Sequence, residues 1–510
     1  MAEQIQLKKS LSLTGVTVNA MALIAPGAFL WITYQVQAAQ ADLAGNTTAM
    51  DMFAGLVFAL VLAFLTAFSY SYLAELYPDA GTGSSYYFAE KAFMNDPSML
   101  SKFARVSKYI VGWFSHLYYW VYPGVMVAMM ATMIVYIVGA FGVTLSVPAE
   151  IAIAVVFSYV TGYVAFRGIN GSTMTSILIN VIQIITLVFV TVLAIIYRLT
   201  NPEHVTFVHK TLPGVVAPHN FLAIMFQATI AILLLVGFES ATALTAEAKS
   251  HKDVSRGVII SLVLQGLIFY LFEYFGANAW LNNSYTVTVG KTVNHGIAAA
   301  AASGAPIGDM VTNLGNVFFH GGGFAFMIIV AVTVAIAVFG TTLACMNTGV
   351  RVTYAMAKDS EVPSVLGALH PKFATPHTAV WIMATVSAVI GAFGVLSITN
   401  LTAVTLFSNV GTFLLYGMTN LITLVAFLRH PERNSFKHTI IPVLGFIANL
   451  GMLLAVFYLG IAGGGITQTA AIWALVGTLA WAIVGVVYFL SNSKKLNRQI
   501  VGKTRVAHNS

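Results

Sequence analysis

The sequence contains very little charge. Only 8% of its 510 residues are Asp, Glu, Lys or Arg and 58% are hydrophobic, whereas a typical soluble domain carries about 25% charged residues. Its 24 basic and 17 acidic side chains are too few to cover the surface that several soluble domains would expose to water. The composition therefore excludes a water-soluble fold and predicts that most of the chain lies in a lipid bilayer.

Cysteine and the common catalytic motifs are also scarce. A single cysteine, Cys345, excludes an internal disulfide framework and a cysteine-rich metal or iron–sulfur site. The sequence contains no Gly-x-x-x-x-Gly-Lys-Ser/Thr phosphate-binding loop, no His-Glu-x-x-His zinc motif and no Gly-x-Ser-x-Gly nucleophile motif. We therefore expect neither an ATP-driven motor nor an enzyme, and no organic cofactor.

Long apolar runs are abundant. A helix needs about 20 mostly apolar residues to cross a hydrocarbon core of about 30 Å. Twelve stretches meet this length, at approximately 13–39, 52–77, 109–141, 151–166, 173–197, 221–248, 258–280, 324–356, 379–396, 401–428, 440–461 and 470–490. The runs are continuous rather than alternating, which favours helices over the strands of a membrane β-barrel. We predict an all-α polytopic membrane protein with about 12 transmembrane helices.

The basic residues indicate the orientation of these helices. With twelve spans both termini lie on one side of the membrane, and every Lys and Arg except Arg198, Lys210 and Lys291 falls on that side. Cytoplasmic loops are enriched in Lys and Arg, so we expect both termini to be cytoplasmic in a cytoplasmic (inner) membrane. The net charge of +7 then reflects topology, and we expect no nucleic-acid partner.

The loops between the runs are too short to hold a soluble domain. The longest, 281–323, lies on the outer side and contains a run of small residues at 296–304. That run is compatible with a re-entrant or surface helix that caps the outer face, and equally with a plain linker.

Two of the predicted spans contain interruptions. In the segment Ala25-Pro26-Gly27-Ala28, Pro26 supplies no N–H donor and Gly27 tolerates dihedrals that a helix does not use. A lone Pro-Gly pair is typical of a kink. A second interruption, at Gly237 in the sixth span, favours a pair of broken helices, as in secondary transporters that bind substrate at the bilayer midplane. Transport is the function class that remains.

Only two of the 17 acidic residues, Glu239 and Glu273, lie well inside predicted spans. An ionised, unpaired carboxylate there costs at least about 2.5 kcal/mol, so such a group is kept for a pathway, a proton site or a structural hydrogen bond. Because Glu239 adjoins a predicted break, we expect it to be functional. Glu273 lies nearer the outer end of the seventh span, where a functional and a structural role are both open.

Three stretches resemble motifs of the amino acid–polyamine–organocation (APC) superfamily of permeases. Residues 74–86, AELYPDAGTGSSY, resemble the passage AELxxxxPxAGGxYxY, with Gly-Thr-Gly-Ser in place of Gly-Gly. Residues 237–256 begin Gly-Phe-Glu-Ser and resemble GFE…EE…NPxRxxPxA, with His251-Lys252 where Asn-Pro is usual. Residues 351–363, RVTYAMAKDSEVP, resemble RxxYAMARDGxxP. The motifs are fairly specific to the superfamily and only weakly to a substrate.

The resemblance implies a leucine-transporter-like fold, a 5+5 inverted repeat with broken helices 1 and 6 plus two peripheral helices. It divides the chain into a cytoplasmic N-terminus (1–12), a first repeat (13–197), a second repeat (198–428), two peripheral helices (429–491) and a basic cytoplasmic tail (492–510).

The resemblance also implies where a substrate binds. The carboxylate of an amino acid would meet the backbone N–H groups of Gly27 and Ala28, beside Pro26 and at the positive end of a half-helix. Its ammonium would meet carbonyl oxygens near Ala25 and at the sixth-span break. The residues expected at that second break are Phe238, a candidate gate, Glu239 and Ser240.

Aromatic residues of the third span are candidate walls of the pocket. By the same resemblance, Tyr118, Tyr119 or Trp120 would line it, and we expect Tyr119 to do so. Ordinary packing or contact with lipid is the alternative for each of them.

The resemblance leaves the coupling ion open. Many proton-coupled relatives place a lysine in the fifth span where this chain has Thr186, which disfavours that mechanism. Sodium-coupled members of the fold use adjacent hydroxyl residues of the eighth span with first-span carbonyls, and Thr341 and Thr342 stand at the corresponding place. Threonines in membrane helices also bond to their own backbone. The candidates are a proton on Glu239, a sodium ion at Thr341 and Thr342, or exchange of two substrates.

We therefore predict a secondary active transporter, a symporter or an exchanger, that carries an amino acid or a related amine by alternating access. It works in the lipid bilayer on a small-molecule substrate, as a monomer or homodimer. The alternatives are a membrane-embedded sensor, which would bind a substrate without moving it, and a channel, which would conduct without saturation.

Overall fold

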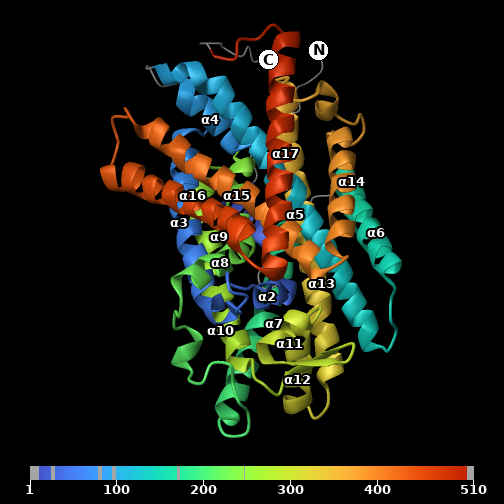
Figure 1. Cartoon of the computed structure of the whole chain (residues 1–510). Helices are drawn as coiled ribbons and strands as arrows, with labels where there is room; N and C mark the ends of the chain where they lie inside the picture. Colours follow the sequence, from blue (N-terminus) through green and yellow to red (C-terminus); the bar gives the residue numbers. More distant parts are fainter. Residues whose placement is uncertain are drawn as a thin grey trace.

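Helices make up nearly all of the computed structural model, which describes residues 11–24, 29–78, 83–94, 99–168, 173–245 and 247–501 (Figure 1). Within these ranges, eleven helices are long and apolar enough to cross a membrane. The first predicted span corresponds to two shorter helices, α1 (Leu13–Ile24) and α2 (Leu30–Ala38). The predicted all-α polytopic fold is confirmed.

Most of the spanning helices are single α-helices. They are α3 (Met52–Leu76), α5 (Ala104–Ala140), α6 (Val147–Phe166), α7 (Thr173–Thr200), α13 (Gly323–Lys358), α14 (His377–Gly394), α15 (Ile398–Phe427), α16 (Ile441–Ala462) and α17 (Gly465–Lys495). A π-helical turn, η9 (Phe436–Ile440), precedes α16.

The sixth span is broken, as the sequence predicts. It begins as α8 (Phe221–Ala231), continues as the 3-10 turn η5 (Ile232–Leu234), and resumes as the 3-10 helix η6 (Phe238–Leu244). Between them Gly237 has a φ of +126°, a conformation that side chains other than glycine rarely adopt. A Cβ at this position would also lie 3.0 Å from the backbone nitrogen of Ile24. The break thus brings the sixth span against the last turn of α1.

The seventh span changes its helical pitch midway. It consists of α9 (His251–Leu262), the π-helix η7 (Val263–Tyr270) and α10 (Leu271–Trp280). π-helical segments are rare and often lie at functional sites. The segment here turns Gln265 and Tyr270 toward the end of α1.

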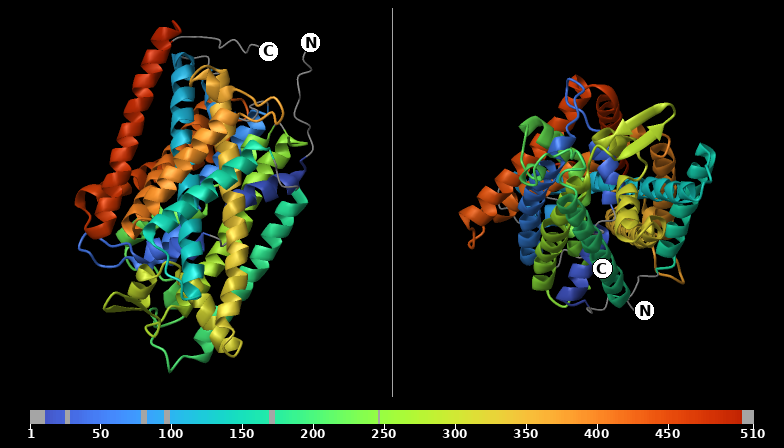
Figure 2. Two further views of the ribbon diagram at one scale, coloured as in Figure 1. Left: turned by 90° about the vertical axis from the view of Figure 1, so that its right-hand side faces the viewer. Right: turned by 90° about the horizontal axis from the view of Figure 1, so that it is seen from below.

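The centre of the bundle is α5, which packs against α4 (Ser85–Met94), α6, α13, α14 and α15. At the periphery, α17 lies along the outside of the bundle in both side views (Figures 1 and 2). Its outward side chains are large and apolar, among them Ile483, Val486 and Val487, each more than half exposed. Lipid is the solvent that such a surface requires.

The two ends of the molecule differ in structure. Figure 1 shows α4 and the C-terminal end of α17 at the top, with α11 and α12 at the bottom. The top end also holds the short helices η3 (Met99–Phe103) and η8 (Ser364–Gly367). The bottom end is the outer side in the topology predicted from the basic residues.

The long outer loop is more ordered than the sequence indicates. Strands β1 (Thr286–Val289) and β2 (Thr292–His295) form an antiparallel hairpin in which Thr286 pairs with His295 and Val289 with Thr292. The small-residue run forms a surface helix, α11 (Gly296–Ala302), packed on α2, and α12 (Pro306–Phe318) follows. The plain-linker interpretation of 296–304 is therefore wrong, and the hairpin was not predicted. Two short turns, η1 (Ala49–Asp51) and η4 (Pro213–Val215), complete the described helices.

Candidate functional site

The end of α1 is capped by side chains from other spans. The last four carbonyl groups of a helix lack partners within the helix. Here Gln265 Nε2 donates to Met21 O at 2.8 Å, Thr341 Oγ1 donates to Ala22 O at 2.8 Å, and Tyr270 OH donates to Ile24 O at 3.1 Å. Such caps stabilise a helix end inside the bundle, at the residue where α1 ends.

Four residues of the predicted substrate site lie directly after this helix end. They are Ala25, Pro26, Gly27 and Ala28, and they lie outside the described residues. The role that the resemblance implies for them stays a prediction.

Glu239 lies at the sixth-span break and is fully buried. Its Oε2 accepts hydrogen bonds from the Gly237 N–H at 2.9 Å and the Tyr416 hydroxyl at 2.8 Å. Its Oε1 lies 3.4 Å from the Tyr119 hydroxyl, a long and weak contact. The structure thus brings together two residues that the sequence analysis proposes, Glu239 and Tyr119, and adds Tyr416 from α15.

Phe238 belongs to a buried aromatic cluster beside this carboxyl. Its ring centroid is 5.2 Å from that of Tyr416 and 6.1 Å from that of Tyr70, and the two tyrosine rings are 6.1 Å apart. Edge-to-face and tilted contacts of this kind are favourable at such distances. Phe238 is therefore held between α3 and α15, and its role as a gate stays a prediction.

The two neighbours of Tyr119 differ in position. The Tyr118 ring packs against Tyr119, with centroids 4.5 Å apart. The indole of Trp120 donates to Thr353 Oγ1 at 3.3 Å, and its ring centroid lies 5.0 Å from that of His116. Successive residues of a helix are rotated by about 100°, so Trp120 faces α13. In this structure Trp120 packs against α13, which is the alternative that we named to its lining the pocket.

Ser240 uses its hydroxyl within the break. Its Oγ donates to Gly237 O at 2.6 Å. The same carbonyl accepts from the Ser240 N–H at 3.0 Å, so backbone and side chain of Ser240 both fix the turn at the break.

The predicted sodium ligands fit a cation only in part. Thr341 Oγ1 lies 2.8 Å from Ala22 O, which places one hydroxyl and one first-span carbonyl together. Thr342 Oγ1 instead donates to Val338 O of its own helix at 2.6 Å. A hard cation prefers several oxygen ligands, and Thr342 is turned away from this pair.

The end of the bundle at which α1 begins is closed at the first span. The Leu11 N–H donates to Glu247 O at 3.0 Å, and the Lys249 N–H donates to Leu11 O at 2.8 Å. Arg351 Nη2 lies 2.9 Å from Glu247 Oε1. These bonds tie the start of α1 to the segment that follows η6 and to α13.

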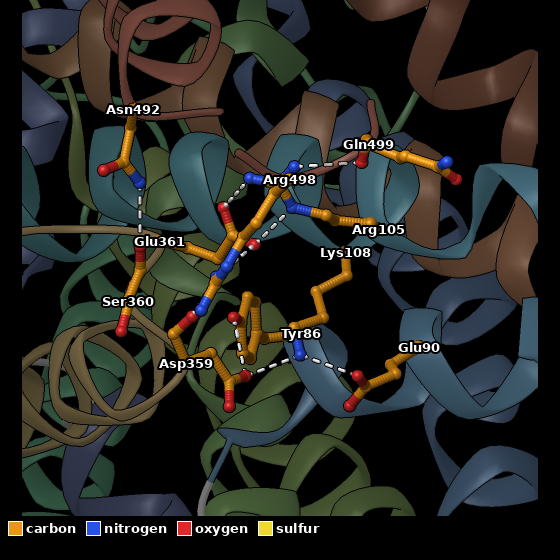
Figure 3. Close-up of polar contacts among 10 residues, drawn as sticks. All are labelled: Tyr86, Glu90, Arg105, Lys108, Asp359, Ser360, Glu361, Asn492, Arg498 and Gln499. Atoms are coloured by element: carbon orange, nitrogen blue, oxygen red, sulfur yellow. Dashed lines mark hydrogen bonds and ion pairs between the residues drawn. The ribbon is translucent and has the colours of Figure 1, made fainter. Parts of the chain in front are cut away.

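A second set of contacts closes the same end between α4, α5 and α13 (Figure 3). Lys108, whose side chain is fully buried, bridges Glu90 Oε1 at 2.7 Å and Asp359 Oδ2. The Tyr86 hydroxyl also donates to Asp359 Oδ2, at 2.9 Å. Buried charges are expensive unless paired and hydrogen bonded, and here each is.

The chain that follows α17 joins this network. Arg105 makes a two-pronged pair with Glu361, at 2.7 and 3.1 Å, and its Nη1 donates to Gln499 O at 3.1 Å. Arg498 donates to Asp359 O at 2.7 Å and lies 3.6 Å from Glu361 Oε1. Figure 3 shows these side chains converging from α5, α13 and the C-terminal segment.

The outer end contains a cavity of about 370 Å³ between α2, α5, α6 and α15, lined in part by Gln35, Thr132, Glu150 and Leu401. Thr132 Oγ1 donates to Glu150 Oε1 at 3.2 Å.

One face of α15 runs from this cavity to Glu239. At helical spacing it carries Leu401, Thr405, Ser408, Thr412 and Tyr416. The hydroxyls of Thr405 and Ser408 are buried, and neither has a hydrogen-bond partner in the described part of the chain.

The sequence analysis missed Tyr416, Tyr70 and the ion network. Tyr416 is the one tyrosine of its apolar run and Tyr70 is one of three in the run 52–77; tyrosines in such runs are equally typical of packing. Their position at Glu239 follows from how the second, sixth and tenth spans pack, which spacing along one helix cannot reveal. Two quoted motifs held signals for the network, since Tyr86 ends the stretch 74–86 and Asp359 lies in the stretch 351–363.

Comparison with known proteins supports a transport function. A model of the amino acid permease family matches residues 9–491. The chain is 24% identical over 344 residues to the branched-chain amino acid permease BcaP of Bacillus subtilis. The aligned region covers 66% of this chain and 63% of that relative. It is 21% identical over 511 residues to the low-affinity putrescine importer PlaP of Escherichia coli, covering 98% of this chain and 96% of the importer. A methylthioribose transporter of Bacillus subtilis is 31% identical over 168 residues, 32% of this chain and 33% of the relative.

Proposed function

The chain belongs to the amino acid permease family, and from that premise we propose that it is a secondary active transporter of an amino acid or a related amine in the cytoplasmic membrane. The names of its relatives specify branched-chain amino acids, putrescine and methylthioribose. An amino group is common to the first two, so an amine-bearing substrate is the class we propose. The site lies within one chain, which is compatible with a monomer or a homodimer.

Glu239 is the observation that carries the proposal. Its hydrogen-bond partners are a backbone N–H and two tyrosine hydroxyls, and all three are neutral. A fully buried carboxylate needs a positive partner or a proton. The ammonium of a substrate at the two helix breaks supplies that charge, and the weak 3.4 Å contact with Tyr119 is the one that it would replace.

The same argument supports proton coupling. Without a cation in the site, the neutral acid is the favoured form of Glu239, and an ammonium favours the carboxylate. Proton and substrate amine therefore compete for one group. We propose that this competition links transport to the proton gradient.

Sodium is a second candidate because of Thr341. The Thr341 hydroxyl and the Ala22 carbonyl lie together at the end of α1 and would supply two of the oxygen ligands of a sodium ion. A bound sodium ion would supply positive charge at the first break. Exchange of two substrates without an ion is the third candidate.

The two ends of the bundle support alternating access. The ion pairs of Lys108, Arg105 and Arg351 close the side that we propose is cytoplasmic, while a cavity opens on the other. Transport requires these ion pairs to separate when the inner side opens and to re-form when it closes.

The experiment that tests the role of Glu239 compares Glu239→Gln with Glu203→Gln, which alters an exposed carboxylate on the outer loop. We expect Glu239→Gln to lose uptake or its pH dependence at normal expression, and Glu203→Gln to behave as the wild type. Normal, pH-dependent uptake by Glu239→Gln would remove Glu239 from the mechanism. A saturable binding signal without movement would favour a sensor, and non-saturating flux would favour a channel.

A further inference from the structure

Glu273 is a second buried carboxyl that the proposed function does not use. It lies on α10 in the outer half of the seventh span and is only 3% exposed. Neither of its carboxyl oxygens has a hydrogen-bond partner among the residues that the structure describes. Buried polar groups are nearly always hydrogen bonded, so an unsatisfied carboxyl needs an explanation.

The elements around α10 provide no counter-charge. It packs against α3, α7, α12, η4 and η7, whose charged side chains are Glu75, Arg198 and Asp309. Glu75 accepts from Ser255, and Asp309 accepts from Tyr136, Tyr285 and Ser303. The Arg198 guanidinium is held at the far end of α7, where Nη2 donates to His209 O and the group lies 3.7 Å from the Phe207 ring centroid; its Nη1 has no partner among the described residues.

The other titratable groups on these elements and at the contact with α2 are tyrosines. They are Tyr34, Tyr70, Tyr72, Tyr197, Tyr270 and Tyr274. None of them can neutralise a carboxylate by charge, since a tyrosine is neutral or negative. In this arrangement Glu273 therefore holds a proton.

Glu273 is linked to the helix breaks by a neighbouring residue of its own span. Tyr270, three residues earlier and so on the same face, donates to Ile24 O at 3.1 Å. Ile24 in turn contacts Gly237, whose N–H bonds to Glu239. A shift of α1 or of the sixth span at the breaks is thus transmitted directly to the helix that carries Glu273.

The outer half of the first span contacts α10 beside Glu273, at the next residue, Tyr274, and at Asn278. The Tyr34 hydroxyl of α2 donates to Asn278 Oδ1 at 2.7 Å, and the Tyr34 and Tyr274 ring centroids are 5.9 Å apart. All residues of α2 are buried. Separation of α2 from α10 would break these contacts beside Glu273 and would open a route for outer water that stabilises a carboxylate.

We propose that Glu273 is a second proton-binding site, which exchanges a proton with the outer solution as α2 separates from α10. The reaction is the protonation of the carboxylate to the carboxylic acid and its reversal, with water as the other partner. The inference rests on the proposed transport function in one respect: if Glu239 pairs with the substrate ammonium, proton symport needs a proton site elsewhere, and Glu273 supplies it.

Infrared spectroscopy tests proton binding independently of transport. The carbonyl stretch of a protonated carboxylic acid is absent from a carboxylate, so pH-difference spectra of wild type and Glu273→Gln in liposomes isolate this group. We expect a protonated band in the wild type that is missing in Glu273→Gln and shifted but present in Glu273→Asp. The same spectrum in wild type and Glu273→Gln would overturn the proposal, whether or not a transported substrate is found.

Proton counting tests its role in the cycle. Proteoliposomes that contain a pH-sensitive dye report the protons moved per labelled substrate, with each variant normalised to its own counterflow. We expect Glu273→Gln to move one proton fewer per substrate than the wild type, Glu273→Asp to retain the wild-type ratio, and Glu203→Gln to serve as the exposed control. An unchanged ratio in Glu273→Gln, or a wild type that moves substrate without protons, would overturn the coupling role.

Discussion

The Tyr416 hydroxyl donates a 2.8 Å hydrogen bond to the carboxyl of Glu239, and so joins the tenth span to the break in the sixth. The same tyrosine ring packs on Phe238 and on Tyr70. One side chain therefore orients both the acid and the candidate gate. Movement of the sixth span relative to α15 must change this bond.

We expect Tyr416→Phe to impair transport while leaving the aromatic cluster intact. A hydrogen bond to a charged group contributes about 1.5–3 kcal/mol, so uptake at low substrate concentration should fall about ten- to hundredfold. Uptake kinetics in proteoliposomes measure this effect. Tyr458→Phe removes a hydroxyl from a tyrosine 47% exposed on the surface of α16 and should match the wild type. Equal loss in both variants would contradict the role of the bond.

We expect Lys108→Met to destabilise the end of the bundle that holds α4 and η8. Lys108 is fully buried between Glu90 and Asp359, and removing one partner of a buried ion pair costs about 3–5 kcal/mol. The melting temperature in detergent should fall well below that of the wild type. The control is Lys102→Met, which alters an exposed lysine of the neighbouring helix η3. A Lys108→Met protein as stable as the control would show that the network contributes little.

We expect thiol reagents to reach Ser408→Cys from the outer side. Ser408 lies on the α15 face between the outer cavity and Glu239, and the native Cys345 is fully buried. A membrane-impermeant thiol reagent should modify Ser408→Cys, and substrate should protect it. Thr423→Cys lies on the inner side of Tyr416 on the same helix and should not react. Reaction at Thr423 and none at Ser408 would place the access path elsewhere.

We expect the outer loop to lose stability in acid through His209. Burial, with the positive charges of His219 and Arg198 nearby, lowers the pKa of His209 from 6.5 to about 4. The folded state thus binds the proton less readily than the unfolded state, so this contribution to stability is full above pH 6.5 and is lost as the pH falls toward 4.

Thermal unfolding of His209→Gln tests this dependence. The melting temperature of the wild type should fall more steeply than that of His209→Gln across this pH range. His204→Gln, which alters an exposed histidine on the same loop, should keep the wild-type slope. Parallel slopes for wild type and His209→Gln would contradict the prediction.

The sequence predicts much of the fold because apolar length and backbone chemistry are local properties. The spanning segments and the break at Gly237 follow from composition and from one residue type, and the structure confirms them. The division into repeats 13–197 and 198–428 stays a prediction. The two-residue turn of the outer hairpin, at Gly290 and Lys291, was a signal that the sequence analysis did not use.

The site was only partly predictable for a different reason. Glu239 is conspicuous because an acid in an apolar run is rare, and Tyr119 was one of three third-span aromatics that the family resemblance implies. The direction of Thr342 depends on a rotation of about 100° from Thr341, and the contact of Tyr416 with Glu239 depends on packing between distant spans. Neither can be obtained from spacing alone.

Counterflow tests the central claim most directly. Proteoliposomes of the wild type are preloaded with a panel of unlabelled amino acids and amines, and the accumulation of external labelled solute is measured. We predict saturable accumulation of at least one amine-bearing solute, absent from empty liposomes and lost or uncoupled from pH in Glu239→Gln. Folded protein that binds such a solute but accumulates none would contradict the assignment as a transporter.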